Sequence, residues 1–357
     1  MWLLNYACFA HNVKYIDTMA KSKVFITGVA GFLGSHLAKR LLKNGHSVSG
    51  CDNMFGGYRD NVPEGVEFHE DDARDFEKMK TLLKGVDIVY HCAAAAPVGL
   101  SVFSPNIVTQ HTYNSTVATI SAAVVNNVKR VVFTSSMDRY GNQGGKGGVF
   151  TEDMPARPVD PYGIAKFASE LFVEMMCKGN GIEYVQAIPH NIFGPKQKYD
   201  DPYRNVVSIM INRMLQGKQP IIYGDGEQKR SFTYITDAID PLEKMGFQAG
   251  LSGEFINIGP DEEFITINEV ARTVARFMDF KLEPIHVPDR PHEVKNAGAS
   301  AGKARKLLGY KTTTSFEEGV KLTIAWIKKR GARPFNYHIE IEIVNGETPS
   351  TWKDKLI

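Results

Sequence analysis

The segment VFITGVAGFLG, residues 24–34, joins a short apolar run to three evenly spaced glycines. The apolar run VFIT predicts a β-strand, and the leucine spacing over Phe32–Lys43 predicts an amphipathic helix. Gly28, Gly31 and Gly34 occupy the turn between them, where the chain must bend tightly and the helix must pack close to the strand. Unpaired N–H groups at the start of such a helix attract phosphate. The segment therefore predicts a loop that binds the pyrophosphate of a dinucleotide.

Asp52 supports the dinucleotide interpretation. It ends the next predicted strand, Ser47–Asp52, eighteen residues after Gly34. A carboxylate at this place accepts hydrogen bonds from the ribose hydroxyls, and it repels a 2′-phosphate. We therefore expect NAD rather than NADP. The alternative is an ordinary strand–helix turn followed by a solvated aspartate.

Strands and helices continue to alternate along the chain. Further strands are predicted at 66–70, 87–93, 130–136, 184–188, 220–224 and 254–259, and further helices at 76–84, 106–127 and 160–178. Nearly continuous apolar strands separated by helices indicate an α/β fold, a Rossmann-type doubly wound parallel sheet. A smaller C-terminal substrate-binding region is expected to follow it.

This pattern divides the chain into four sections. We expect a leader or extended start with little structure at 1–20 and an NAD-binding Rossmann domain that carries the catalytic residues at 21–190. A mainly substrate-binding region, interleaved with the first domain, is expected at 191–330, and a tail at 331–357. Within the tail, HIEIEIV (residues 338–344) alternates apolar and polar side chains, which predicts an added strand or hairpin.

Composition excludes several classes of protein. The 357 residues carry 42 Lys plus Arg against 40 Asp plus Glu, and this balance provides no electrostatic footprint for nucleic acid. No apolar run reaches the roughly 18 residues that span a membrane. The four cysteines (Cys8, Cys51, Cys92 and Cys177) are widely separated, so we expect neither a disulfide framework nor a metal site. A reducing, cytoplasmic location follows from that cysteine usage.

The glycine spacing G-x-x-G-x-x-G resembles the extended short-chain dehydrogenase/reductase family, in particular its NAD-dependent nucleotide-sugar epimerases and dehydratases of the UDP-glucose 4-epimerase type. Asp71–Asp75 is similar to that family's adenine-contacting segment, and His91–Ala94 is similar to its H-x-A-A stretch. The resemblance covers roughly residues 23–330. It implies that NAD is held by Gly28, Gly31, Phe32, Leu33, Gly34, Asp52, Asn53, Asp72, Ala73, Ala93, Ala94, Tyr162 and Lys166.

Tyr162 and Lys166 are four residues apart in a predicted helix, so their side chains share one face. A phenol with a pKa near 10 is a poor base, but a neighbouring ammonium and an oxidised nicotinamide both favour the phenolate. Ser136 closes the strand 130–136, at the edge where sites form in such sheets. A tyrosine four residues before a lysine is common on helices. The family resemblance nevertheless implies a catalytic triad of Ser136, Tyr162 and Lys166.

Three further segments are similar to family motifs that grip the diphosphate of a sugar nucleotide. They supply Asn191, Arg230 and Arg290, and arginine donates to phosphate in a planar fork. Separately, each arginine is more often a surface ion-pair partner. The resemblance implies a UDP-linked sugar as substrate, and a homodimer formed through the helices at 106–127 and 160–178.

Ser136, Met137 and Asp138 bear on the reaction. Family dehydratases carry Thr-Asp-Glu at these positions, and Met137 cannot donate a proton. Decarboxylases often place Glu where Asp138 stands, whereas epimerases usually have a small or neutral residue there. We expect a UDP-hexose 4-epimerase that works through a transient 4-keto sugar. UDP-glucuronate decarboxylation, a 4,6-dehydratase and, more distantly, a non-catalytic NAD- or RNA-binding role remain alternatives.

Overall fold

The computed structural model describes residues 21–142, 149–291, 294 and 296–357, so the predicted leader at 1–20 lies outside the described residues. Within these ranges, seven parallel strands form one sheet in the order β3-β2-β1-β4-β5-β7-β12. This order confirms the predicted Rossmann-type sheet. The strands are β1 (Lys23–Thr27), β2 (Ser47–Cys51), β3 (Glu67–His69), β4 (Ile88–His91), β5 (Arg130–Thr134), β7 (Glu183–Pro189) and β12 (Phe255–Ile258).

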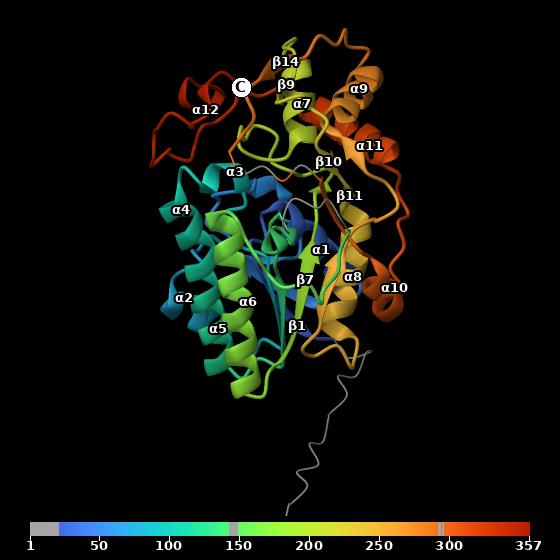
Figure 1. Ribbon diagram of the computed structural model, residues 1–357. Helices are drawn as coiled ribbons and strands as arrows, with labels where there is room; N and C mark the ends of the chain where they lie inside the picture. The colour runs from blue at the N-terminus through green and yellow to red at the C-terminus, as the bar shows by residue number, and fades with distance from the viewer. Residues whose placement is uncertain (1–20, 143–148, 292–293, 295) are drawn as a thin grey trace, which may run out of the picture.

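Helices cover both faces of this sheet (Figure 1). One layer contains α2 (Phe76–Leu82), α5 (Ser115–Val125) and α6 (Pro161–Gly179), and the other contains α1 (Phe32–Lys43), α8 (Ile235–Phe247) and α10 (Gly302–Leu308). Successive residues of β1 enter opposite layers, because Val24 and Ile26 join one hydrophobic cluster and Phe25 joins the other. This alternation explains why a strand buried on both faces is apolar throughout.

A smaller group of elements lies at the upper end of the view in Figure 1. It contains helices α7, α9 and α11 beside the strand pair β9–β14. The bounds are α7 (Val206–Leu215), α9 (Ile267–Met278), α11 (Phe316–Arg330), β9 (Ile221–Tyr223) and β14 (Ile285–Val287). Shorter strands, which pair with one another, are β6 (Val149–Phe150), β8 (Ile192–Phe193), β10 (Lys229–Arg230), β11 (Thr233–Tyr234), β13 (Ile265–Thr266) and β15 (Asn296–Ala299).

The predicted helix at 106–127 is divided. It consists of α4 (Pro105–Thr109), a π-helical turn, η2 (Gln110–Asn114), and α5. Hydroxyl groups at the start of α5 bond back to the turn: Ser115 donates to the carbonyl of His111, and Thr116 donates to the carbonyl of Thr112. Turns of this kind often mark functional sites, and this one adjoins the cavity described below.

The predicted strand at 338–344 is wrong. Between α11 and the short helix α12 (Ser350–Lys353), the tail forms no strand. Its alternating residues bury Ile339 against a separate hydrophobic cluster, while its backbone and Glu342 bond to the start of α4. Of the apolar residues in this segment, Ile339 is buried, whereas Ile343 and Val344 are exposed, so the alternation matches the burial only in part. No helix in the described ranges is long and apolar enough to cross a membrane.

Candidate active site

The glycine loop after β1 approaches neighbouring backbone too closely for a side chain. A Cβ on Gly28, whose φ is +73°, would lie 3.1 Å from the backbone of Ala93. A Cβ on Gly34 would overlap the carbonyl oxygen of Gly28. Helix α1 begins directly after Gly31 without a side-chain cap. The loop therefore presents bare backbone and uncapped N–H groups, which fit a pyrophosphate.

Acidic groups follow at the ends of β2 and β3. The carboxylate of Asp52 accepts hydrogen bonds from the backbone N–H groups of Ala30 (3.0 Å) and Met54 (2.8 Å), and burial raises its pKa. Burial also acts to raise the pKa of Asp72. Hydrogen bonds from Arg74 and Asn53 outweigh this effect and lower the pKa of Asp72 to about 2. Both carboxylates border the cavity beside the glycine loop.

Tyr162 and Lys166 lie in the first half of α6, which Asp160 caps by accepting from the N–H of Gly163 at 2.8 Å. The ammonium of Lys166 donates to the carbonyl of Thr134 at 2.7 Å and lies 5.9 Å from the centre of the Tyr162 ring. Burial lowers the pKa of Lys166 to about 8. Burial, reinforced by the charge of Asp138, raises the pKa of the Tyr162 phenol.

Ser136 donates a hydrogen bond to the carboxylate of Asp138 at 2.6 Å. Burial raises the pKa of Asp138. Burial and then the charge of Asp138 raise the pKa of Asp160 to about 7. The charges of these two carboxyl groups both raise the pKa of Tyr162, and their mutual repulsion disfavours ionisation of both at once.

Two adjoining cavities, of about 200 and 460 Å³, divide the predicted residues between them. All thirteen predicted NAD-binding residues border the smaller cavity, hereafter the cofactor cavity. Ser136 and the other five predicted substrate-binding residues, namely Met137, Asp138, Asn191, Arg230 and Arg290, border the larger one, hereafter the substrate cavity. Tyr162 borders both, whereas Lys166 borders only the cofactor cavity.

The predicted substrate residues come from separate segments. Asn191, whose φ is +42°, follows β7 and donates to the carbonyl of Ser231 at 3.0 Å. Arg230 lies in β10, and its charge favours ionisation of Asp138. Arg290 follows β14 and places its guanidinium 4.8 Å from the centre of the Tyr223 ring. These contacts bring the three motifs to one cavity.

Several residues that border the cavities were not among the predicted site residues. Arg204 borders both cavities, and a Cβ on Gly56 would lie 2.7 Å from its guanidinium. Phe55 and His111 stack at 4.2 Å between ring centres on the wall of the cofactor cavity. Trp352, from the tail, borders the substrate cavity. No periodicity or spacing in the sequence distinguishes these side chains from ordinary surface or core residues.

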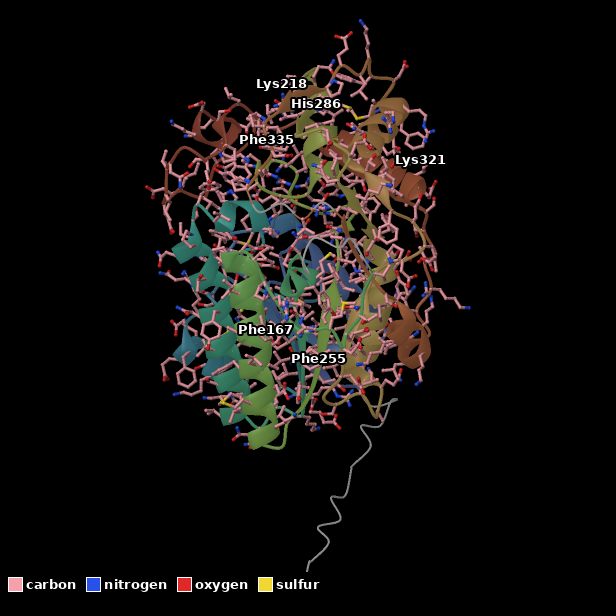
Figure 2. The ribbon with its side chains drawn as sticks, viewed as in Figure 1. Phe167, Lys218, Phe255, His286, Lys321 and Phe335 are labelled. Carbon is pink, nitrogen blue, oxygen red and sulfur yellow. The ribbon has the colours of Figure 1, made fainter. Side chains whose placement is uncertain are left out.

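A buried ion pair supports the strand end that carries Ser136. Arg139 and Glu170 meet at 2.9 Å, and both side chains are less than a tenth exposed. Ser135 donates to the same carboxylate. The rings of Phe167 and Phe255, labelled in Figure 2, have their centres 6.0 and 5.5 Å from the Arg139 guanidinium. The pair fixes the chain on either side of Ser136 against α6.

A sequence model of the NAD dependent epimerase/dehydratase family matches residues 24–259. The chain belongs to this family. NAD is therefore its cofactor, and the glycine loop, Asp52 and the uncapped start of α1 fit it.

Individual relatives extend over most of the chain. This chain is 31% identical over 331 residues to a UDP-N-acetyl-alpha-D-glucosaminuronate decarboxylase of Bacillus cytotoxicus, and the match covers 87% of this chain and 98% of that protein. It is 29% identical over 318 residues to a UDP-glucose 4-epimerase of Mycolicibacterium smegmatis, covering 86% and 99%. The crystal structure of Thermus thermophilus UDP-glucose 4-epimerase in complex with NAD superposes with a TM-score of 0.79 at 30% identity, covering 85% and 98%.

We expect Gly34→Ala to lower NAD affinity about tenfold or more, because overpacking of 1–3 kcal/mol must be relieved by moving the Gly28 loop. The measurements are the amount of NAD released when purified protein is denatured, and the Kd from titration of NAD-free protein with NAD. Gly179→Ala is the matched control, because a Cβ there meets no atom within 4 Å. Equal NAD content in both variants would contradict the assigned role of the loop.

Proposed function

We propose that the protein is an NAD-dependent nucleotide-sugar 4-epimerase that acts on a UDP-linked hexose. The observation that carries this proposal is that Tyr162 borders both cavities, with Ser136 on the substrate side and Lys166 on the cofactor side. A group that removes a proton from a sugar hydroxyl while the carbon-bound hydrogen leaves toward nicotinamide must contact both compartments.

In the proposed reaction, Ser136 holds the C4 oxygen of the sugar, and the Tyr162 phenolate accepts the C4 hydroxyl proton. NAD, held by the residues of the cofactor cavity, would supply the acceptor for the C4 hydride and the donor for its return. Lys166, held by the Thr134 carbonyl, supplies positive charge beside the phenolate. The 4-keto sugar then rotates in the cavity and presents its opposite face. Tyr162 returns the proton, and the opposite C4 configuration results. No additional acid or base is required, which suits a site with methionine at 137.

In the same cavity, Arg230, Arg290 and Asn191 are proposed to bind the diphosphate. Guanidinium groups pair with phosphate oxygens in a bidentate manner, and all three residues line the same cavity. The UDP-sugar relatives support UDP as the nucleotide.

The test is NMR of purified protein with UDP-glucose, UDP-N-acetylglucosamine or UDP-glucuronate and no added NAD. We expect the C4 epimer of one sugar, with little NADH accumulating. Tyr162→Phe should lower kcat by about 10² to 10⁴ with NAD content unchanged, and Tyr113→Phe, outside both cavities, is its control. A 4-keto-6-deoxy product, or no turnover despite bound NAD, would contradict the proposal.

A second candidate is UDP-glucuronate decarboxylation. Its support is the Asp138 carboxylate, which borders the substrate cavity 2.6 Å from Ser136, together with the decarboxylase relative. In that reaction the same C4 oxidation would precede loss of the C6 carboxylate as carbon dioxide, and Asp138 would add proton transfer. A pentose product in the NMR test distinguishes this candidate.

Asp138→Asn separates the two candidates. Under the epimerase proposal, activity persists and the acidic limb of the pH–rate profile moves to lower pH, because removing a negative charge lowers the pKa of Tyr162. If Asp138 transfers a proton, turnover falls about 100-fold or more. Asp153→Asn, at a solvent-exposed site, controls for loss of charge alone. An unmoved acidic limb would refute the assigned electrostatic role.

We also propose a homodimer formed through α5 and α6. Ile164, Leu171 and Met175 form an exposed apolar stripe on α6, each more than half exposed, and Val125 of α5 is also exposed. Sedimentation velocity should give a dimer, and Met175→Glu should shift it toward monomer. Ile285→Glu, on exposed β14, should leave the dimer intact. A monomeric parent protein would overturn this proposal.

A further inference from the structure

The tail, residues 331–357, lies outside the family match at 24–259 but contributes to the substrate cavity. In Figure 1 it runs beside α3 (Val98–Ser101) and ends near β9 and β14. Two of its residues, Trp352 and Ile357, border the substrate cavity and are buried. The tail therefore forms a wall of the cavity.

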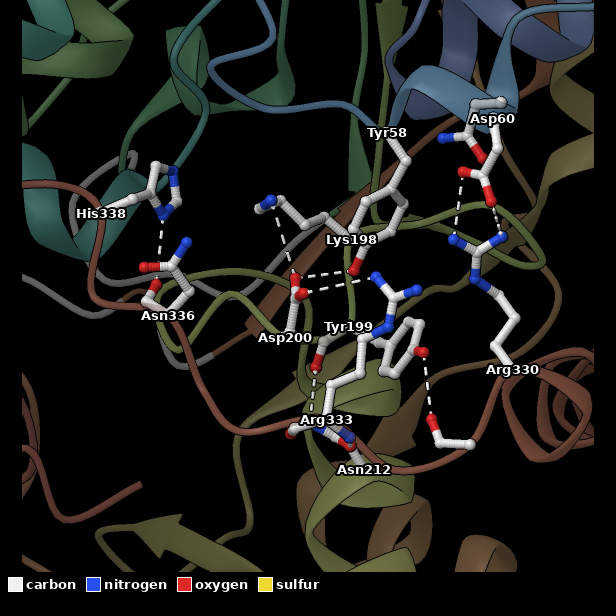
Figure 3. Close-up of polar contacts among 12 residues, drawn as sticks. Tyr58, Asp60, Lys198, Tyr199, Asp200, Asn212, Arg330, Arg333, Asn336 and His338 are labelled. Atoms are coloured by element: carbon white, nitrogen blue, oxygen red, sulfur yellow. Dashed lines mark hydrogen bonds and ion pairs between the residues drawn. The ribbon is translucent and has the colours of Figure 1, made fainter.

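The first part of the tail is anchored to the loop before α7. Figure 3 shows Asp200 at the centre of this junction, where it accepts a hydrogen bond from the Tyr58 hydroxyl at 2.6 Å. The backbone carbonyl of Asp200 accepts from the N–H of Asn336 at 2.7 Å. The Arg333 guanidinium lies 3.8 Å from the same carboxylate, and just before the tail Arg330, the last residue of α11, pairs with Asp60 at 2.6 Å. These contacts join the tail to the cofactor-binding half of the chain.

The later part of the tail is anchored on both sides of Trp352. Glu342 accepts hydrogen bonds from the first N–H groups of α4, each at 2.9 Å. Thr351 bonds to the hydroxyl of Tyr223 at 2.6 Å, and Arg213 donates to the carbonyl of Leu356 at 3.2 Å. Trp352 is thereby held in one position.

The Trp352 ring packs among aromatic neighbours. Its centre lies 5.7 Å from that of Tyr203, 6.2 Å from Phe103 and 6.3 Å from Tyr223. A Cβ on Gly99 would lie 3.1 Å from the Trp352 ring and 3.6 Å from the Arg290 guanidinium. Trp352 therefore adjoins the arginine that we propose binds the diphosphate.

The indole N–H of Trp352 meets no acceptor in the part of the chain that the structure describes, although the side chain is only 2% exposed. Buried tryptophan N–H groups usually have a partner, because an unpaired donor costs free energy. Since the ring borders the substrate cavity, an oxygen of a bound substrate that reaches the edge of the ring would complete this hydrogen bond.

We propose that Trp352 is a substrate-binding residue whose indole N–H donates to an oxygen of the nucleoside diphosphate half of the substrate. The tail thereby helps to select the nucleotide of the substrate. This inference rests on the proposed function for its ligand class.

The test uses Trp352 as its own reporter. Trp2→Phe and Trp326→Phe leave Trp352 as the single tryptophan, and its emission should change saturably as UDP is added. Trp352→Phe should raise the Kd for UDP about tenfold, as expected for one lost hydrogen bond to a charged acceptor, and should raise KM while kcat changes little. Trp326→Phe alone is the matched control, because that ring packs on Tyr199 away from the cavity.

Replacing Trp352 by benzothienylalanine in the single-tryptophan protein preserves ring shape but removes the N–H, and should weaken UDP binding as Trp352→Phe does. Titration with uridine and with pyrophosphate then assigns the oxygen to the base or to the phosphates. The inference would be overturned, but not the proposed function, if the protein epimerises a UDP-sugar while UDP leaves the Trp352 emission unchanged and Trp352→Phe leaves the Kd for UDP unchanged. A Trp352 response to UDP without epimerisation would support the inference and refute the proposed function.

Discussion

At the carboxyl end of β1, the Thr27 hydroxyl connects the segments that build the cofactor cavity. It accepts from the N–H groups of Cys92 and Ala93, each at 3.1 Å, and donates to Nδ1 of His91 at 2.7 Å. Burial lowers the pKa of His91 to about 3, so the ring is neutral and its Nε2–H donates to Thr116 at 3.0 Å. Because this network holds Ala93 against the loop after β1, only glycine fits at position 28.

The same edge of the sheet concentrates charge where water has limited access. Lys166, Asp138 and Asp160 are all close to Tyr162, and each has a pKa displaced toward its neutral form by burial. Such displaced values are characteristic of active sites. The Arg139–Glu170 pair is different, because its two charges form an ion pair with each other and support the Ser136 strand end. The charged groups beside Tyr162 are available for proton transfer, whereas the Arg139–Glu170 pair has a structural role.

The predicted site residues separate into two groups by how they could be found. The glycine loop, Asp52 and the Tyr162–Lys166 pair depend on short-range spacing, which fixes a turn or a helix face whatever surrounds it. Asn191, Arg230 and Arg290 were identified through family motifs, since nothing in their local sequence relates one to another. Neither short-range spacing nor a family motif identified Arg204 or Trp352. They reach the cavities only because distant segments pack together.

The amino-acid sequence by itself determined the alternation of strands and helices in the α/β fold, the glycine loop and the helix that carries Tyr162 and Lys166, because these depend on contacts within a few turns of chain. Tertiary structure alone decided that Tyr162 lies where two cavities meet and that the tail forms a wall of one of them. The alternation in residues 338–344 predicted a strand, yet the segment forms none, and Ile339 packs in a cluster built from several distant segments. Periodicity predicts which side chains can be buried, but whether they are buried, and by which surface, is set by segments far away in sequence.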